Sequence, residues 1–332
     1  MSVPAATAIT DRLAAHLLRR ARWRWLELIF WLGVLTVIFA LPSRAAIINE
    51  ALIAGLFALS LDLILGLAGI VSLGHAAFLG LGAYAAAILA SNGFADPFLG
   101  LAFGAGIAAL VGLVTAPLLL RGGDLTRLMV TLGVSLMLGE LANRNGWLTG
   151  GADGLNFSMA PVLGLFPIGF TGQRNAALYS FAVLFILFAI ARRLAHSPFG
   201  LSLAATRENR LRAGALGVDT SRRIVAIYTV AAAYAGAAGA LLAQTTQIVS
   251  LDVFDFHRSA DVMLMLIIGG AGYLYGGLIG AAAFTVLRDV ISAATPNIGN
   301  SGLGSLWSYS CWPAVSEWQE RPGVSSPSSR RA

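Results

Sequence analysis

Long apolar segments recur along this chain, and they constrain its fold more than any other feature of the sequence. The first reads LELIFWLGVLTVIFAL, and about 20 apolar residues are enough for a helix to cross the hydrocarbon layer of a membrane. About eight spans are predicted, at Leu26–Leu41, Ile47–Leu67, Ala76–Ala90, Phe98–Leu120, Leu128–Trp147, Ala176–Leu194, Ile224–Gln244 and Ala260–Ile291. The last segment is long enough for a span with a Gly-rich bend.

The composition supports an all-α, polytopic integral membrane helical bundle. Hydrophobic residues make up 57% of the 332 residues and charged residues only 11%. A soluble domain has about 45–50% apolar and about 25% charged residues. One compact soluble core of this size cannot bury so many apolar side chains, so the expected partner of this surface is the lipid bilayer.

The basic residues indicate how the chain is oriented. All are arginine, the formal net charge is +6, and five arginines precede the first span within residues 1–25. In membrane proteins arginines collect in cytoplasmic loops, and this tendency explains the positive charge better than nucleic-acid binding does. The arginine distribution places the N-terminus, residues 121–127, residues 192–223 and Arg288 in the cytoplasm. The expected outer segments, residues 42–50, 91–97, 146–175 and 245–259, contain only Arg44, Arg174 and Arg258.

Several enzyme and metal-site classes are excluded by what the sequence lacks. Without lysine there is no phosphate-binding loop of the G-x-x-x-x-G-K-[ST] type. The single cysteine, Cys311, permits no intramolecular disulfide, and no two of the four histidines have zinc-ligand spacing. No catalytic constellation is present. We therefore expect no cofactor, no metal and no enzymatic activity on this chain.

A few polar residues lie inside the apolar segments, where an ionisable group is costly and often functional. Asp62 is predicted either to cap a broken neighbouring helix or to contact substrate. Glu140 is spaced to pair with Arg144 on one helix face, or to act in the pathway. His75 is expected to bond backbone carbonyls, or else to relay protons or bind a metal.

Glycine, with 38 residues, is concentrated in the apolar segments. Pairs such as Gly100 and Gly104 have the four-residue spacing that lets helix backbones approach closely in lipid. The run Gly66–Gly74 predicts a helix break at membrane depth, where irregular backbone must be buried or line a cavity. The pathway or helix-break candidates are Asp62, Gly69, Ser72, Gly74, His75, Glu140, Gly270 and Gly272.

A charged insert, SPFGLSLAATRENRLRAGALG, separates two apolar segments at Ser197–Gly217. Ser197 and Pro198 are typical of a helix start, and Gly214 and Gly217 of a helix stop. One short cytoplasmic helix is predicted. Its pattern alone allows two positions, on the anionic inner leaflet of the membrane or in a groove of another protein.

Four segments together resemble the permease subunits of branched-chain amino acid ABC importers, of the LivM type. They are SLDLILGLAGIVSLGHAAFLGLGAYAAAILA at residues 60–90, WLTGGADGL at 147–155, SPFGLSLAATRENRLRAGALGVDTSRRIVAIYTVAAAYAGAAGALLA at 197–243, and LMLIIGGAGYLYGGLIGAA at 264–282. Their order and spacing agree over residues 46–291.

The resemblance implies a place in a larger assembly in the bacterial inner membrane. A second, LivH-type permease would complete the pathway, two cytoplasmic ATP-binding subunits would drive it, and a periplasmic binding protein would deliver substrate. The cargo would be a branched-chain amino acid or a related small polar solute; close relatives carry urea, amides or small aromatic acids. The insert would be the coupling helix, and its expected coupling residues are Arg207, Glu208, Arg210, Arg212, Gly214 and Gly217.

The chain departs from the family pattern at two places. The coupling helix reads Glu208-Asn209-Arg210 where the family usually has Glu-Asn-Glu. After the permease domain, residues 26–292, an atypical polar tail over 293–332 replaces a final apolar span. We hypothesise a frameshift near Pro296.

Two other functional classes compete with the importer. An ion-coupled secondary carrier of small solutes needs intramembrane charges, for which Asp62 and Glu140 are the candidates. A membrane-embedded enzyme needs a catalytic set of residues, which the sequence does not contain.

Overall fold

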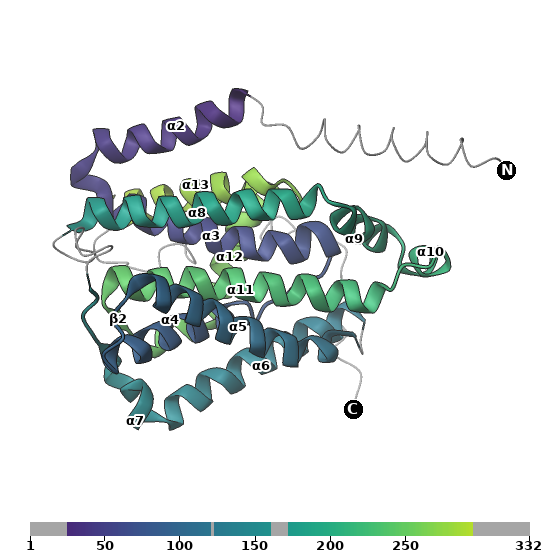
Figure 1. Cartoon of the computed structure of the whole chain (residues 1–332), viewed down its shortest axis with the longest axis horizontal. Helices are drawn as coiled ribbons and strands as arrows, with labels where there is room; N and C mark the ends of the chain where they lie inside the picture. Colours follow the sequence, from purple (N-terminus) through teal and green to yellow (C-terminus); the bar gives the residue numbers. More distant parts are fainter. Residues whose placement is uncertain (1–24, 121–122, 161–171, 295–332) are drawn as a thin grey trace, which may run out of the picture. The chain divides into compact units, whose positions relative to one another are not determined.

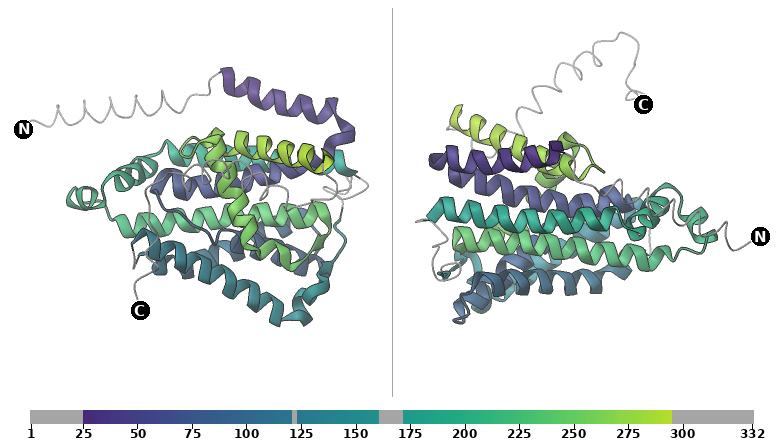
Figure 2. Two further views of the ribbon diagram at one scale, coloured as in Figure 1. Left: turned by 180° about the vertical axis from the view of Figure 1, so that it is seen from behind. Right: turned by 45° about the horizontal axis from the view of Figure 1, so that its top comes forward.

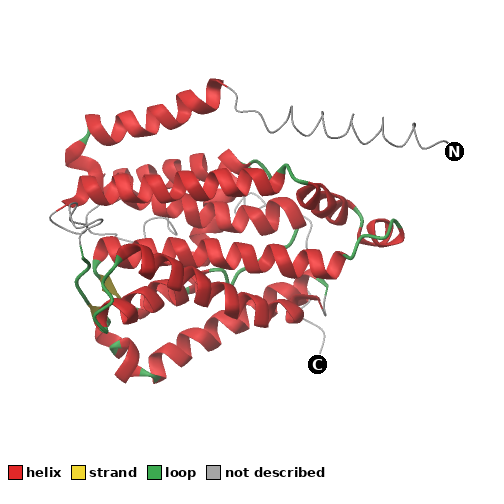
Figure 3. Cartoon of the chain, in the orientation of Figure 1, coloured by secondary structure: helices red, strands yellow, loops and turns green. Residues whose placement is uncertain are grey.

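The computed structural model describes residues 25–120, 123–160 and 172–294. Most of the described residues are helical (Figure 3), which confirms the predicted all-α membrane fold. The chain forms two compact units, residues 1–283 and 284–332. The described part of the second unit is the end of the last helix, and the site described below lies within the first.

The α-helices and strand β2 are labelled in Figure 1. The helices are α2 (Trp25–Ala40), α3 (Ala45–Ala68), α4 (Ala76–Ser91), α5 (Pro97–Leu120), α6 (Asp124–Arg144), α7 (Gly146–Thr149), α8 (Gln173–Ala195), α9 (Pro198–Glu208), α10 (Arg210–Ala215), α11 (Thr220–Thr246), α12 (Phe256–Gly269) and α13 (Leu274–Ala294). Short 3-10 turns are η1 (Pro42–Arg44), η2 (Gly151–Asp153) and η4 (Leu251–Phe254), and the strands are β1 (Leu155–Asn156) and β2 (Ile248–Val249).

Six helices of the described chain are long and apolar enough to cross a membrane. They cover Pro42–Ala68, Pro97–Leu120, Leu125–Arg144, Gln173–Ala195, Thr220–Thr246 and Leu274–Ser292. Two shorter apolar helices, Glu27–Ala40 and Ala76–Ser91, lie at two further predicted spans. Every predicted segment therefore contains helix, but a count of eight full spans is not confirmed.

The predicted span Ala260–Ile291 is two helices. α12 ends at Gly269, and the turn before α13 contains Gly270 and Gly272, both at φ 91°. An added Cβ at Gly269 would lie 1.8 Å from Gly276 O, and one at Gly280 would lie 1.8 Å from Met265 O. The start of α13 thus runs back along α12 as a hairpin. Only α13 of this hairpin is long and apolar enough to be a candidate span, and the cytoplasmic assignment of Arg288 stays a prediction.

The core of the first unit forms where α11 packs against α3, α4 and α5 (Figures 1 and 2). Glycines make this packing close: an added Cβ at Gly239 would lie 1.9 Å from Leu79 O, and one at Gly82 would lie 2.1 Å from Gly236 O. Small residues at helix contacts give close packing in lipid. An added Cβ at Gly104 would likewise lie 2.7 Å from Gly82 O, so Gly104 is a packing position as predicted.

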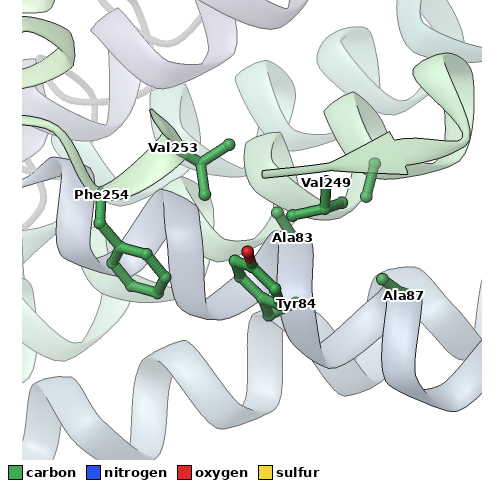
Figure 4. Packing of buried hydrophobic residues seen from close by; sticks show 7 residues of the cluster. Ala83, Tyr84, Ala87, Val249, Val253 and Phe254 are labelled. Carbon is green, nitrogen blue, oxygen red and sulfur yellow. The ribbon is translucent and has the colours of Figure 1, made fainter. Parts of the chain in front are cut away.

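Two short strands and η4 cover one end of α4. β1 and β2 pair antiparallel, with Leu155 opposite Val249. Val249, Val253 and Phe254 then pack against Tyr84 and its neighbours on α4 (Figure 4), where the Phe254 and Tyr84 rings stack at 5.7 Å. The helices α9 and α10 lie at the opposite end of α8 and α11 (Figure 1). The first unit therefore has two distinct ends.

Candidate functional site

The apolar segment from Ala45 to Ser91 is interrupted where the sequence predicts a break. α3 ends at Gly69, whose left-handed backbone (φ 68°, ψ 24°) directs the chain away from the helix axis. Residues 70–75 are not helical, and α4 begins at Ala76. An added Cβ at Gly74 would lie 1.9 Å from Thr131 O of α6. The irregular backbone is thus packed inside the protein, as membrane depth requires.

His75 fixes this interruption from within. Its side chain is fully buried, stacks on Phe57 and meets Phe78 edge-on. Its Nε2 lies 2.8 Å from Ser60 Oγ. Because the Ser60 hydroxyl donates to Phe57 O, Nε2 is the donor in this pair. The arrangement fits the structural alternative for His75, with a side-chain hydroxyl as acceptor rather than the expected backbone carbonyl.

The first turn of α4 receives a cap from a distant helix. The buried Ser259 of α12 accepts a hydrogen bond from Ala76 N at 2.9 Å. The first amides of a helix have no partner within that helix, so an outside acceptor is stabilising. Sequence reasoning missed Ser259, and no local pattern marks it.

Ser72, one of the predicted helix-break residues, is also buried. Its hydroxyl bonds no group in residues 25–120, 123–160 and 172–294.

Asp62 connects the two Gly-rich interruptions. It is buried near the end of α3, and its Oδ1 accepts a hydrogen bond of 2.7 Å from Gly272 N, in the turn between α12 and α13. The predicted capping of a broken neighbouring helix is the geometry that the structure shows. Gly270 and Gly272 have positive φ, and both lie in this turn.

Glu140 and Arg144 are exposed, unlike the buried residues that a proton relay inside a membrane protein would use. Their side chains are 56% and 78% exposed, and Arg144 Nε lies 3.0 Å from Glu140 Oε1. Both stand in the last two turns of α6. The structure therefore joins Asp62, Gly69, Gly270 and Gly272 around two breaks, whereas Glu140 forms a local pair.

The insert at Ser197–Gly217 is two helices rather than the single predicted one. Asn209, at φ −157° and ψ 106°, ends α9 and caps α10, because its Oδ1 accepts from Arg212 N at 3.0 Å. Asparagine favours such caps over helix interiors. Ser197 caps α9 as predicted. The predicted stop at Gly214 is wrong, because Gly214 lies inside α10; Gly217 (φ 84°) follows the helix instead.

The coupling candidates point in different directions. Arg207, Glu208 and Arg212 are all exposed, but the Arg207 guanidinium reaches α3, where its Nη1 donates to Gly66 O at 2.6 Å. Leu203 and Ala213 are buried and hold α9 and α10 on the protein. Leu211 and Leu216, two of the apolar positions of the insert, are 88% and 77% exposed.

A further buried ion pair was also missed by sequence reasoning. Arg192, at the end of α8, pairs with Glu27 of α2, and both side chains are largely buried. Removing one partner of such a pair leaves an uncompensated buried charge.

In the described chain, no group of three His, Cys, Asp or Glu residues could hold a metal ion.

The family model described as "Branched-chain amino acid transport system / permease component" matches residues 43–312. The chain belongs to this family. The match includes both Gly-rich interruptions, α9 and α10. It continues past Pro296, but residues 295–332 lie outside the described residues, so the frameshift stays a hypothesis.

Individual members of the family are similar over most of this chain. The high-affinity branched-chain amino acid transport system permease protein LivM of Salmonella typhimurium is 28% identical, over 79% of this chain and 68% of its own length. LivM of Escherichia coli is 29% identical, over 70% of this chain and 60% of its own. A probable LivH permease protein of Methanocaldococcus jannaschii is 28% identical, over 56% of this chain and 60% of its own. No solved structure matches the chain significantly.

Proposed function

We propose that this chain is a permease subunit of an ABC importer and forms part of the pathway for branched-chain amino acids or a related small polar solute. Its family and the names of its relatives support the substrate class. ATP hydrolysis would take place on separate subunits, in keeping with the absence of a lysine-containing phosphate loop from the sequence.

The observation that carries the coupling role is the exposed apolar tip of α10. Leu211 and Leu216 are almost fully exposed, and α10 projects past the ends of α8 and α11 (Figures 1 and 2). A helix of six residues offers little surface to a membrane interface. Two projecting leucines beside arginines instead suit a partner's groove, so we favour docking on an ATP-binding subunit.

The full assembly would include two such ATP-binding subunits, a second LivH-type permease and a periplasmic binding protein. The chain would span the bacterial inner membrane several times, with its N-terminus in the cytoplasm. This orientation rests on the arginines before the first span and around α9 and α10. Both groups would then face the cytoplasm.

The ion-coupled carrier loses its two candidate residues in this structure. Asp62 accepts a hydrogen bond from Gly272 N, and Glu140 pairs with an exposed arginine. Each is satisfied within the chain, and Glu140 is exposed. Neither is a free intramembrane charge of the kind that ion coupling uses.

Uptake by reconstituted vesicles tests the proposal. The chain would be assembled with its second permease, ATP-binding subunits and binding protein, and labelled leucine, isoleucine, valine, urea and amides would be offered in turn. We expect ATP-dependent uptake of a branched-chain amino acid. Uptake that persists without the ATP-binding subunits would refute the importer, and uptake of urea or amides alone would refute a branched-chain amino acid as the cargo.

The docking role makes a sharper prediction at Leu211. Burial of a leucine contributes about 1.5–3 kcal/mol, and a buried carboxylate costs more. Leu211→Asp should therefore weaken binding of the ATP-binding subunit at least about tenfold, measured with the detergent-purified permease. Leu148→Asp, an exposed leucine on α7 at the other end of the first unit, is the matched control. Equal affinities of both variants would contradict docking through α10.

A further inference from the structure

Three chain segments meet at one point beside the last turn of α3. They are that turn itself, the α12–α13 turn at residues 270–273, and the Arg207 side chain from the end of α9. The meeting is close, because an added Cβ at Gly66 would lie 2.6 Å from Asp62 Oδ1 and 3.0 Å from Gly272 Cα. No side chain fits between α3 and the second turn at this position.

Arg207 lies across both interruptions. Its Nη1 donates to Gly66 O at 2.6 Å. An added Cβ at Gly69, where α3 ends, would lie 2.8 Å from Arg207 Cγ. An added Cβ at Gly272 would lie 3.4 Å from Arg207 Nη1. One side chain from α9 therefore contacts the end of α3 and the turn between α12 and α13.

The chemistry of the contact favours a cation here. The last carbonyls of a helix have no partner within that helix and carry partial negative charge, so an arginine at the end of α3 is stabilised. The Asp62 carboxylate, one turn before Gly66, holds Gly272 N at 2.7 Å. Asp62 thus ties the second turn to α3, and Arg207 ties the end of α3 to α9.

We propose that Arg207 is a positioning residue that makes α9 and the two Gly-rich interruptions move together. This rests on the proposed function, since a partner must displace α9. When α9 moves, the bond to Gly66 O transmits the displacement to the end of α3, and the Asp62–Gly272 bond carries it to the α12–α13 turn. Coupling then depends on a contact inside the permease as well as on the docking surface.

The ratio of substrate transported to ATP hydrolysed tests this role. Coupling between sites is commonly worth about 5- to 150-fold, so Arg207→Ala should lower the ratio at least about fivefold while ATP hydrolysis continues. Arg207→Lys keeps a cationic donor and should recover part of the loss. Arg222→Ala is the control, because Arg222 is 89% exposed and pairs with Asp219 at 2.9 Å. Absence of uptake by the wild-type assembly would refute the proposed function; a normal ratio in Arg207→Ala, with wild-type uptake intact, would refute only the role of Arg207.

A distance measurement tests the contact without transport or partners. Cys311→Ser removes the only native thiol of the sequence, and spin labels are then attached at Ala205→Cys on α9 and Tyr273→Cys in the second turn, both exposed positions. We expect a narrow distribution of label distances that broadens with Arg207→Ala and stays narrow with Arg222→Ala. Equal widths with and without the Arg207 side chain would overturn the proposal.

Discussion

The two Gly-rich interruptions look alike in sequence and differ in how they are held. The break between α3 and α4 begins at Gly69 and the turn between α12 and α13 at Gly270, each with positive φ. Most of residues 70–75 are buried, whereas residues 271–273 are exposed. The first is enclosed by protein, and the second is accessible.

Their anchors explain the difference. The first interruption is held by the packing of His75, by the cap from Ser259 and by the close approach of Thr131 O to Gly74. The second is tied to its surroundings by Asp62 and contacted by Arg207. A Gly-rich signature therefore predicts a break and does not predict how the break is held.

The largest expected effect comes from removing the anchor of the first break. His75→Ala deletes a fully buried ring that packs on two phenylalanines and bonds Ser60. Loss of a buried aromatic side chain costs about 3–5 kcal/mol, so the free energy of unfolding should fall by about 3 kcal/mol. Thermal unfolding of the detergent-purified protein measures this loss.

The matched change in the second interruption is Tyr273→Ala. The Tyr273 side chain is 76% exposed, and surface substitutions usually change stability by less than about 0.5 kcal/mol. Its melting temperature should stay near that of the wild type. If both variants lost stability equally, the contrast between an enclosed and an exposed interruption would be lost.

An intermediate effect is expected from the cap on α4. Ser259→Ala leaves the buried amide of Ala76 without its acceptor, and loss of a helix cap costs about 0.5–2 kcal/mol. We expect a loss of about 1 kcal/mol and faster hydrogen exchange at the start of α4. Ser202→Ala is the control, because the Ser202 hydroxyl bonds Phe199 O within its own helix. Unchanged exchange in the Ser259 variant would show that the cap does not hold the break.

The smallest effect concerns a second histidine near a helix start, His257 in the first turn of α12. Unlike His75 it is exposed, and its hydrogen bond to Asp255, aided by the carboxylate charge, raises the pKa of His257 above 6.5. Protonated His257 therefore stabilises the folded protein at pH values below its unfolded pKa. This contribution is lost as the pH rises through the higher folded pKa.

Asp255→Asn should lower the pKa of His257 toward its ordinary value. An NMR titration of the ring protons measures this shift, with Asp219→Asn as a control carboxylate beside Arg222. An unchanged pKa in the Asp255 variant would mean that the pair is not formed in solution.

Sequence reasoning succeeded where the signal is local. The apolar segments, the break near Gly69 and the Ser197 cap each depend on neighbouring residues, and the structure has all three. It failed where two local rules compete. Asn209 lies within a helix-like stretch, yet its side chain bonds Arg212 N and divides the insert into two helices.

The sequence by itself determined a helical membrane protein of this permease family, since apolar segment length and ordered motifs are properties of the chain. Only the tertiary structure decided which polar groups meet. Ala76 and its cap Ser259 are 183 residues apart, Asp62 and Gly272 are 210 apart, and Arg207 and Gly66 are 141 apart. Such partners are chosen by helix packing, because a buried polar group must find its bond wherever the fold brings one within reach.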